Sequence, residues 1–170
     1  GMSSKEPMLA VKHLYSEMYA GGILAVGNHV ANFCDYTSLV TLLGQRDTNL
    51  EFVMNHLDPR IDTTFLYKKD APTIVKKRII DEYSFVKLLE IYDIDDAGLG
   101  ATDNRELCRE LLLKLETNDV SLIVDFGHGM LSDEAVDVLC QKSKFLAVNT
   151  QANAGNRGYH AVSRYPRADF

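Results

Sequence analysis

The clearest pattern of apolar and polar positions lies in the second half of the chain. The stretch from Thr102 to Glu116 carries leucines at every fourth position, which predicts an amphipathic helix. Two short apolar runs follow at Val120–Val124 and Phe145–Val148, each long enough for a buried strand. Between them, Ser132 is placed to cap a second helix. Strand, helix and strand with short connections form a βαβ unit, which predicts a parallel sheet in an α/β fold.

The first half of the chain mixes helical and strand periods. An alternating stretch from Met8 to Tyr15 predicts a strand, residues Leu24 to Phe33 predict a helix, and Ser38 to Leu43 predict a buried strand. From Thr63 to Ile94 the period is two, with a turn at residues 81–84, which predicts antiparallel strands. An inserted or projecting β-flap would explain antiparallel strands between the elements of a parallel sheet.

Composition and charge narrow the class of protein. The 170 residues fit one domain, and 46% hydrophobic with 25% charged residues is ordinary globular composition. A net charge of −6 argues against general binding to nucleic acid or to an anionic membrane surface, and no apolar run is long enough to span a bilayer. Three widely spaced cysteines predict reduced thiols in a cytoplasmic protein. The histidines and cysteines show no metal-ligand spacing, so we expect no metal site.

Polar and glycine-rich segments follow both strands of the βαβ unit. One runs Asp-Phe-Gly-His-Gly over residues 125–129, and the other begins Asn-Thr-Gln-Ala-Asn at residue 149. Ligands of open parallel sheets bind beyond the carboxyl ends of the strands. Aspartate, asparagine and glutamine suit sugar hydroxyls, which both donate and accept hydrogen bonds. The alternative is a plain turn in which Asp125 caps the loop and the glycines only bend it.

A double glycine, Gly21-Gly22, precedes the predicted helix of the first half. Free N–H groups at a helix N-terminus can meet a polar ligand there. Together with Gly27 the spacing resembles the start of a P-loop, but Asn28-His29 replace the lysine and hydroxyl residue that phosphates and Mg²⁺ require. A tight turn needed for packing explains the glycines equally well.

Lys76 and Arg78 form a third candidate. On a strand they share one face while Lys77 points away. Two cations on one face could contact a phosphate, and arginine suits bidentate contact with anions. The alternative is a solvated strand face, which is the more common role of such charges.

Several segments, taken in order, resemble ribokinase/PfkB-type carbohydrate kinases. They are Glu6–Lys12, Tyr19–Gly22, Val26–Ala31, the strand at 39–44, Thr73-x-x-Lys76-x-Arg78 and Asp125-Phe-x-x-Gly129. The closest resemblance is to the kinase domain of bifunctional heptose-phosphate kinase/nucleotidyltransferases, and it extends over nearly the whole chain. It implies a partial ribokinase-like fold in which strands at about 8–15 and 63–94 form a β-lid. The core would comprise about 21–44 and 102–149, and the lid would mediate a homodimer.

The resemblance also implies a function in nucleotide-sugar biosynthesis, with a sugar or sugar phosphate as ligand. The residues that it and the strand-end rule assign to this site are Gly21, Gly22, Asn28, Lys76, Arg78, Asp125, His128, Asn149, Gln151 and Asn153. Two departures from the family stand out. Ala25 occupies the position where the family usually places a sugar-binding asparagine, and Asn149-Thr-Gln151 replaces the Asp-Pro-Lys of heptose kinases.

The family's ATP-binding half, with its Gly-Ala-Gly-Asp motif, has no counterpart up to Phe170. ATP and Mg²⁺ are therefore implied for the full-length family but not for these residues, and we expect no catalytic residue here and no kinase activity from this chain alone. The parent would be a carbohydrate kinase or a nucleotide-sugar synthetase. One alternative is a catalytically dead kinase-like scaffold or dimerisation module beside a nucleotidyltransferase. Another is an unrelated Rossmann-like binding domain.

Overall fold

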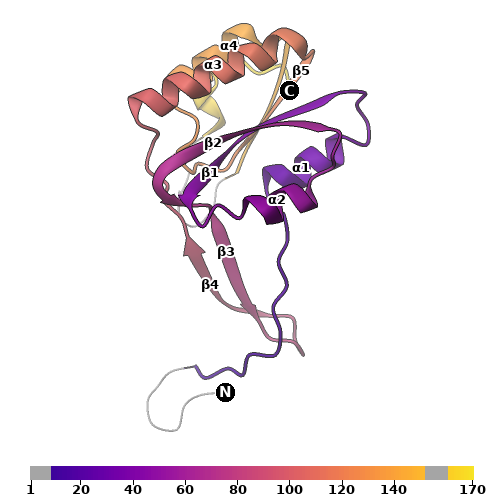
Figure 1. Cartoon of the computed structure of the whole chain (residues 1–170), viewed down its shortest axis with the longest axis vertical. Coiled ribbons are helices and arrows are strands. Elements are labelled where there is room, and N and C mark those ends of the chain that lie inside the picture. Colours follow the sequence, from indigo (N-terminus) through magenta and orange to yellow (C-terminus); the bar gives the residue numbers. More distant parts are fainter. Residues whose placement is uncertain (1–8, 152–160) are drawn as a thin grey trace.

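The computed structural model describes residues 9–151 and 161–170 (Figure 1). Its helices are α1 (Ile23–Val30), α2 (Leu50–His56), α3 (Ala101–Thr117) and α4 (Asp133–Lys142), with a short 3₁₀ turn η1 at Val162–Arg164. Its strands are β1 (Thr37–Arg46), β2 (Ile61–Pro72), β3 (Val75–Ile80), β4 (Lys87–Asp93), β5 (Val120–Asp125) and β6 (Phe145–Thr150).

The strands form three pairs. β1 lies parallel to β2, and β5 lies parallel to β6, with α4 as the crossover between them. β3 and β4 form an antiparallel hairpin, which Figure 1 shows projecting away from the helices and parallel strands. The predicted α/β class, with parallel strands and a projecting antiparallel element, is confirmed. The arrangement is consistent with a partial Rossmann-like fold.

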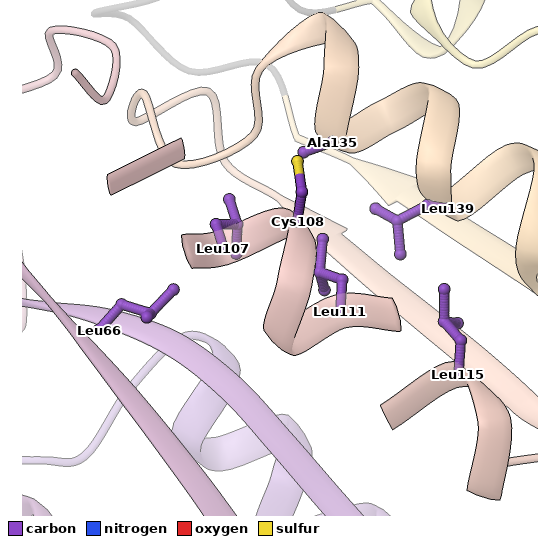
Figure 2. Packing of buried hydrophobic residues seen from close by; sticks show 7 residues of the cluster. All are labelled: Leu66, Leu107, Cys108, Leu111, Leu115, Ala135 and Leu139. Atoms are coloured by element: carbon purple, nitrogen blue, oxygen red, sulfur yellow. The ribbon is translucent and has the colours of Figure 1, made fainter. Parts of the chain in front are cut away.

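The main core lies where α3 packs between β2 and α4. Seven buried side chains meet there, and Figure 2 shows them pointing toward one another. They are Leu66 of β2, Leu107, Cys108, Leu111 and Leu115 of α3, and Ala135 and Leu139 of α4. The leucine spacing read from the sequence is therefore the buried stripe of α3. A second cluster packs α1 and α2 against the other face of β1, with Leu39 and Leu43 at its centre.

The β3–β4 hairpin is fastened to the parallel strands at both of its ends. At its entry, the Thr73 hydroxyl donates to the carbonyl of Thr48 and accepts from the Gly44 N–H, each at 2.9 Å. After its exit, the buried ammonium of Lys68 donates to the carbonyls of Asp95 (2.9 Å) and Ala97 (2.6 Å). A lysine is seldom buried without such partners, so this contact fixes the segment that leaves the hairpin.

Three sequence predictions are wrong in detail. No strand forms over residues 9–15, where Leu9 makes an isolated bridge; Met8 lies outside the described residues. The antiparallel region does not begin at Thr63, because residues up to Pro72 belong to β2 and pair in parallel with β1. β5 is not fully buried, since Val120 and Leu122 are 60% and 42% exposed. In each case local periodicity was read correctly, but the neighbour that decides pairing or burial is distant in sequence.

Candidate functional site

Two candidate residues from separate parts of the chain meet in the structure. The ammonium of Lys76, on β3, lies 3.1 Å from Nε2 of His128, in the loop after β5. The same ammonium lies 5.3 Å from the centroid of the Tyr92 ring, on the neighbouring strand β4. This contact joins the hairpin to the carboxyl end of β5, where the sheet rule predicts a ligand.

Compared with water, the environment of Lys76 favours the neutral amine over the ammonium form. Burial lowers the pKa of Lys76, and the positive charge of Arg78 lowers it further, whereas Glu90 raises it. A negatively charged ligand would act in the same direction as Glu90, because an opposite charge favours the ammonium form. An anionic ligand beside Lys76 would therefore stabilise its ammonium form, which a neutral ligand would not do.

Arg78 lies on the same face of β3 but is already paired. Its Nε donates to Oε1 of Glu90, the directly opposite residue on β4, at 2.6 Å. Both side chains are substantially exposed, and such pairs contribute little to stability. This pairing matches the alternative of a solvated strand face. The Arg78 guanidinium could nevertheless exchange Glu90 for an anion of higher charge.

Asp125, at the end of β5, is almost completely buried. Its Oδ1 accepts from the Gly127 N–H at 2.8 Å, and its Oδ2 accepts from the Tyr165 hydroxyl at 2.9 Å. Arg164 brings a guanidinium nitrogen within 3.7 Å of the same Oδ2. The first of these bonds is the loop cap that the plain-turn interpretation expects. Asp125 thus shapes the loop that carries His128.

The glycines of this loop have a conformational reason to be there. Gly127 and Gly129 both have positive φ, and a Cβ on Gly129 would lie 2.2 Å from the carbonyl oxygen of Ala97. Only glycine fits at residue 129 without moving backbone. The close approach packs the loop against the segment that leaves the hairpin. The ammonium of Lys68 donates to the same carbonyl.

The double glycine reaches the same region. Gly22 has φ +58, and a Cβ there would lie 3.5 Å from the ring of Phe126, in the loop after β5. Gly21 precedes it and has open space around its Cα. The N-terminus of α1 therefore lies beside the loop that carries His128.

The remaining candidate residues are placed differently. The carboxamide of Asn28 donates to the carbonyl of His56 (2.7 Å) and accepts from the N–H of Asp58 (2.8 Å), so it ties α1 to the end of α2. Asn149 is exposed on β6, opposite Val124, and the backbone N–H of Gln151 donates to the carbonyl of Asp125. Asn153 lies outside the described residues.

Sequence reasoning missed two residues, Tyr165 and Arg164. Burial raises the pKa of Tyr165, and the neighbouring Asp125 raises it further, so the hydroxyl remains a donor. Arg164 also donates to the Leu131 carbonyl (3.0 Å) and to Asp133 (2.9 Å). No local pattern marks this segment, because its partners lie some 30 to 40 residues earlier.

Within residues 9–151 and 161–170, no three His, Cys, Asp or Glu side chains are grouped so that they could hold a metal ion. In the same part of the chain, no helix is long and apolar enough to cross a membrane.

Parallel strand pairs with helical crossovers define an α/β protein that is consistent with a partial Rossmann-like fold. No family model matches the chain. It is 28% identical over 152 residues to the bifunctional protein HldE of Haemophilus influenzae (strain PittEE). The matched region covers 89% of this chain and 29% of that protein. It is 23% identical over 163 residues to the bifunctional protein HldE of Shewanella sp. (strain W3-18-1), covering 95% and 33%.

These similarities confirm the resemblance to the bifunctional heptose-phosphate kinase/nucleotidyltransferases that the sequence indicates. The chain spans about a third or less of the length of these relatives.

Proposed function

We propose that this chain is the sugar-phosphate-binding part of a PfkB-type carbohydrate kinase domain that serves heptose-type nucleotide-sugar biosynthesis. The observation that carries the proposal is the contact between Lys76 and His128, which joins the hairpin to the β5 loop. The similarity to bifunctional HldE proteins over about nine-tenths of the chain supports it from a second direction.

In this proposal the phosphate lies between Lys76 and His128. The half-buried ammonium of Lys76 donates to one phosphate oxygen, and an imidazole N–H of His128 donates to another. Arg78 joins them by exchanging its exposed pairing with Glu90 for the doubly charged ligand. Charge-assisted bonds of this kind are about twice as strong as neutral ones, so they supply most of the selectivity for a phosphorylated sugar.

The sugar hydroxyls face the carboxyl ends of β5 and β6. Asn149 and Gln151 supply side-chain amides there, and Gly21-Gly22 supply backbone N–H groups at the start of α1. Asp125 acts as a positioning residue, because both of its oxygens already accept hydrogen bonds within the protein. Asn28 contributes only if it gives up its bonds to the end of α2.

We also propose that these 170 residues do not phosphorylate a sugar by themselves. The glycine spacing at Gly22 and Gly27 is followed by Asn28-His29, which cannot replace a phosphate-binding lysine and a Mg²⁺-binding hydroxyl. Phosphoryl transfer needs a cradle for the donor's phosphates and usually Mg²⁺, and these 170 residues also contain no Gly-Ala-Gly-Asp segment of the kind that the resembled kinases use. ATP and Mg²⁺ would be bound by other parts of a longer polypeptide.

Calorimetric titration tests the proposed ligand. A heptose 7-phosphate, a hexose phosphate, the unphosphorylated heptose and Mg-ATP are titrated separately. We expect saturable binding of a sugar phosphate, none of Mg-ATP, and much weaker binding of the free sugar. Lys76→Ala should weaken sugar-phosphate binding roughly 10- to 150-fold, since a hydrogen bond to a charged group is worth about 1.5–3 kcal/mol.

Lys77→Ala is the matched control, because Lys77 is exposed on the opposite face of the same strand. If Lys76→Ala and Lys77→Ala weaken binding equally, the effect comes from the loss of a positive charge on the strand and not from a specific contact with Lys76. Tight binding of the unphosphorylated heptose would refute the phosphate site.

The hairpin supports a second candidate function, a dimerisation module. Every residue of β4 is exposed, and large apolar side chains of Leu88, Leu89, Ile91 and Phe85 reach solvent. A lone two-stranded hairpin is marginally stable, so a second copy packed on it would stabilise it. We expect a homodimer in light-scattering measurements, and a monomer for Leu89→Lys combined with Ile91→Lys. If the unsubstituted chain is still a monomer at about 100 μM, a concentration at which even weak dimers form, this role is refuted.

A further inference from the structure

The loop between β5 and α4, residues 126–131, carries His128 but contains no helix or strand. Two of its residues, Gly127 and Gly129, have positive φ. Glycine adopts such values at no steric cost, but it adopts many others as readily, so the glycines do not by themselves hold the loop in one conformation. Contacts from outside the loop are therefore needed to fix the position of His128.

Arg164, at the end of η1, contacts both ends of this loop. Its Nη2 donates to the carbonyl of Leu131 at 3.0 Å, and its Nη1 lies 3.7 Å from Oδ2 of Asp125. His128 lies three residues from each of these two contacts. The donors of a guanidinium are rigid and coplanar, so a single side chain that makes both contacts restrains the distance between the two loop ends.

The contact at the start of the loop is the more sheltered one. The side chain of Asp125 is 7% exposed and that of Arg164 is 27% exposed, so solvent screens this pair only weakly. Arg164 also pairs with Asp133 at 2.9 Å, but the Asp133 side chain is 97% exposed and such a pair contributes little. The next residue, Tyr165, donates to Asp125 as well. Residues 164 and 165 thus fasten the loop through buried groups.

We propose that Arg164 is a positioning residue for the sugar-phosphate site. By joining Asp125 to Leu131, it keeps the loop in the conformation in which Nε2 of His128 lies 3.1 Å from the ammonium of Lys76. Arg164 acts on the ligand only through His128. The inference rests on the proposed function for the identity of the ligand, whereas the restraint on the loop exists without a ligand.

Arg167 offers a matched control. Its Nη1 donates to the carbonyls of Cys140 (3.1 Å) and Ser143 (2.8 Å), at the opposite end of α4 from the loop. The side chains of Arg164 and Arg167 are similarly exposed, at 27% and 38%. Arg164→Ala and Arg167→Ala therefore each remove a guanidinium that binds backbone carbonyls, but only Arg164→Ala releases the loop.

Calorimetric titration with a heptose 7-phosphate tests the effect on binding. Arg164→Ala should weaken binding about tenfold or more, because a displaced His128 loses its bond to the phosphate. Arg167→Ala should change the affinity less than about twofold. In a His128→Ala background, Arg164→Ala should have no further effect, since a residue that acts through another has none once that other is gone. Equal losses for the two arginine variants, or additive losses for Arg164 and His128, would overturn the proposal.

Backbone amide exchange followed by mass spectrometry tests the loop without any ligand. Arg164→Ala should speed exchange in residues 127–131, because local opening becomes easier when a restraint is lost. Arg167→Ala should leave exchange in these residues unchanged. Unchanged exchange in the Arg164→Ala loop overturns the proposal. If the unsubstituted chain binds no sugar phosphate, the proposed function fails, and exchange alone then decides whether Arg164 holds the loop.

Arg164→Lys keeps the test valid if Arg164→Ala does not fold. The lysine retains a cation near the buried carboxylate of Asp125, but an ammonium lacks the planar set of donors that contacts both loop ends. We expect a urea midpoint close to that of the unsubstituted chain and binding of the heptose 7-phosphate that is weaker by about threefold or more. Full affinity in this variant would show that a positive charge is sufficient and would refute the bridging role.

Discussion

Tyr165→Phe isolates the structural role of Asp125. Tyr165 and Asp125 are each only 6% exposed, and the tyrosine hydroxyl donates to the carboxylate across 2.9 Å. The substitution removes one oxygen atom and keeps the ring, so packing changes little. Oδ2 of Asp125 then keeps only the more distant guanidinium of Arg164, 3.7 Å away, as a side-chain partner among the described residues. The buried carboxylate loses its shortest side-chain partner.

The expected cost follows from the chemistry of that bond. A hydrogen bond to a charged group contributes about 1.5–3 kcal/mol to stability, and whole domains have about 5–15 kcal/mol. We therefore expect the unfolding constant to rise roughly 10- to 150-fold. For a chain of this length, that free energy corresponds to a fall in melting temperature of roughly 3–12 °C.

The assay is urea unfolding followed by far-ultraviolet circular dichroism, because the chain contains no tryptophan. Tyr83→Phe is the control, since Tyr83 is 97% exposed at the tip of the hairpin. A Tyr165→Phe protein whose stability lies within about 0.5 kcal/mol of the Tyr83→Phe protein would refute the reasoning. It would mean that Asp125 obtains equivalent solvation elsewhere.

Other substitutions test the loop and the helix ends. Gly129→Ala should destabilise the protein by more than about 1 kcal/mol, because its Cβ would meet the Ala97 carbonyl at 2.2 Å; Gly98→Ala, which meets nothing within 4 Å, serves as control in the same melts. Ser132→Ala should cost about 1 kcal/mol, since it removes the cap of α4, and an unchanged urea midpoint would contradict this. Stability should fall as the pH rises above about 10, because the folded state keeps the proton of Tyr165 longer than the unfolded state does, and Tyr165→Phe should flatten that fall.

The sequence patterns that proved reliable are those set by near neighbours. The leucine stripe of α3 and the cap at Ser132 depend on residues within a few positions, and the structure has both. The parallel pairing of the βαβ unit was predicted from the order of strand, helix and strand, and the structure has it too. The hairpin turn at residues 81–84 also forms where the period-two pattern predicts it. The stripe, the cap and the turn are each encoded by residues that are near neighbours in the sequence.

Pairing between distant segments could not be read in the same way. The alternation within β2 fits a strand of either sheet, and only its neighbour β1 decides that it is parallel. Helix α2 was missed because it spans only seven residues, and because its N-cap residue Asn49 has a left-handed conformation and makes no side-chain cap hydrogen bond. The resemblance assigned Lys76 and His128 to the same site, but no local pattern predicts the direct contact between these two residues, which are separated by 52 positions. The contact of Tyr165 with Asp125 spans 40 positions and has no local signal either.

In the described part of the chain, the β3–β4 hairpin is anchored at one end only, and its tip projects from the rest of the structure (Figure 1). Thr73 fixes one leg and Lys68, through Ala97, fixes the other, so bending displaces the far end most and the root least. Lys76 lies three residues beyond Thr73, near the root, whereas Tyr83 lies at the tip. Any bending of the hairpin would therefore displace Lys76 less than Tyr83. The β3–β4 hairpin can therefore hold a positive charge in a fixed position at its anchored end and present an apolar surface that adjusts to a partner at its tip.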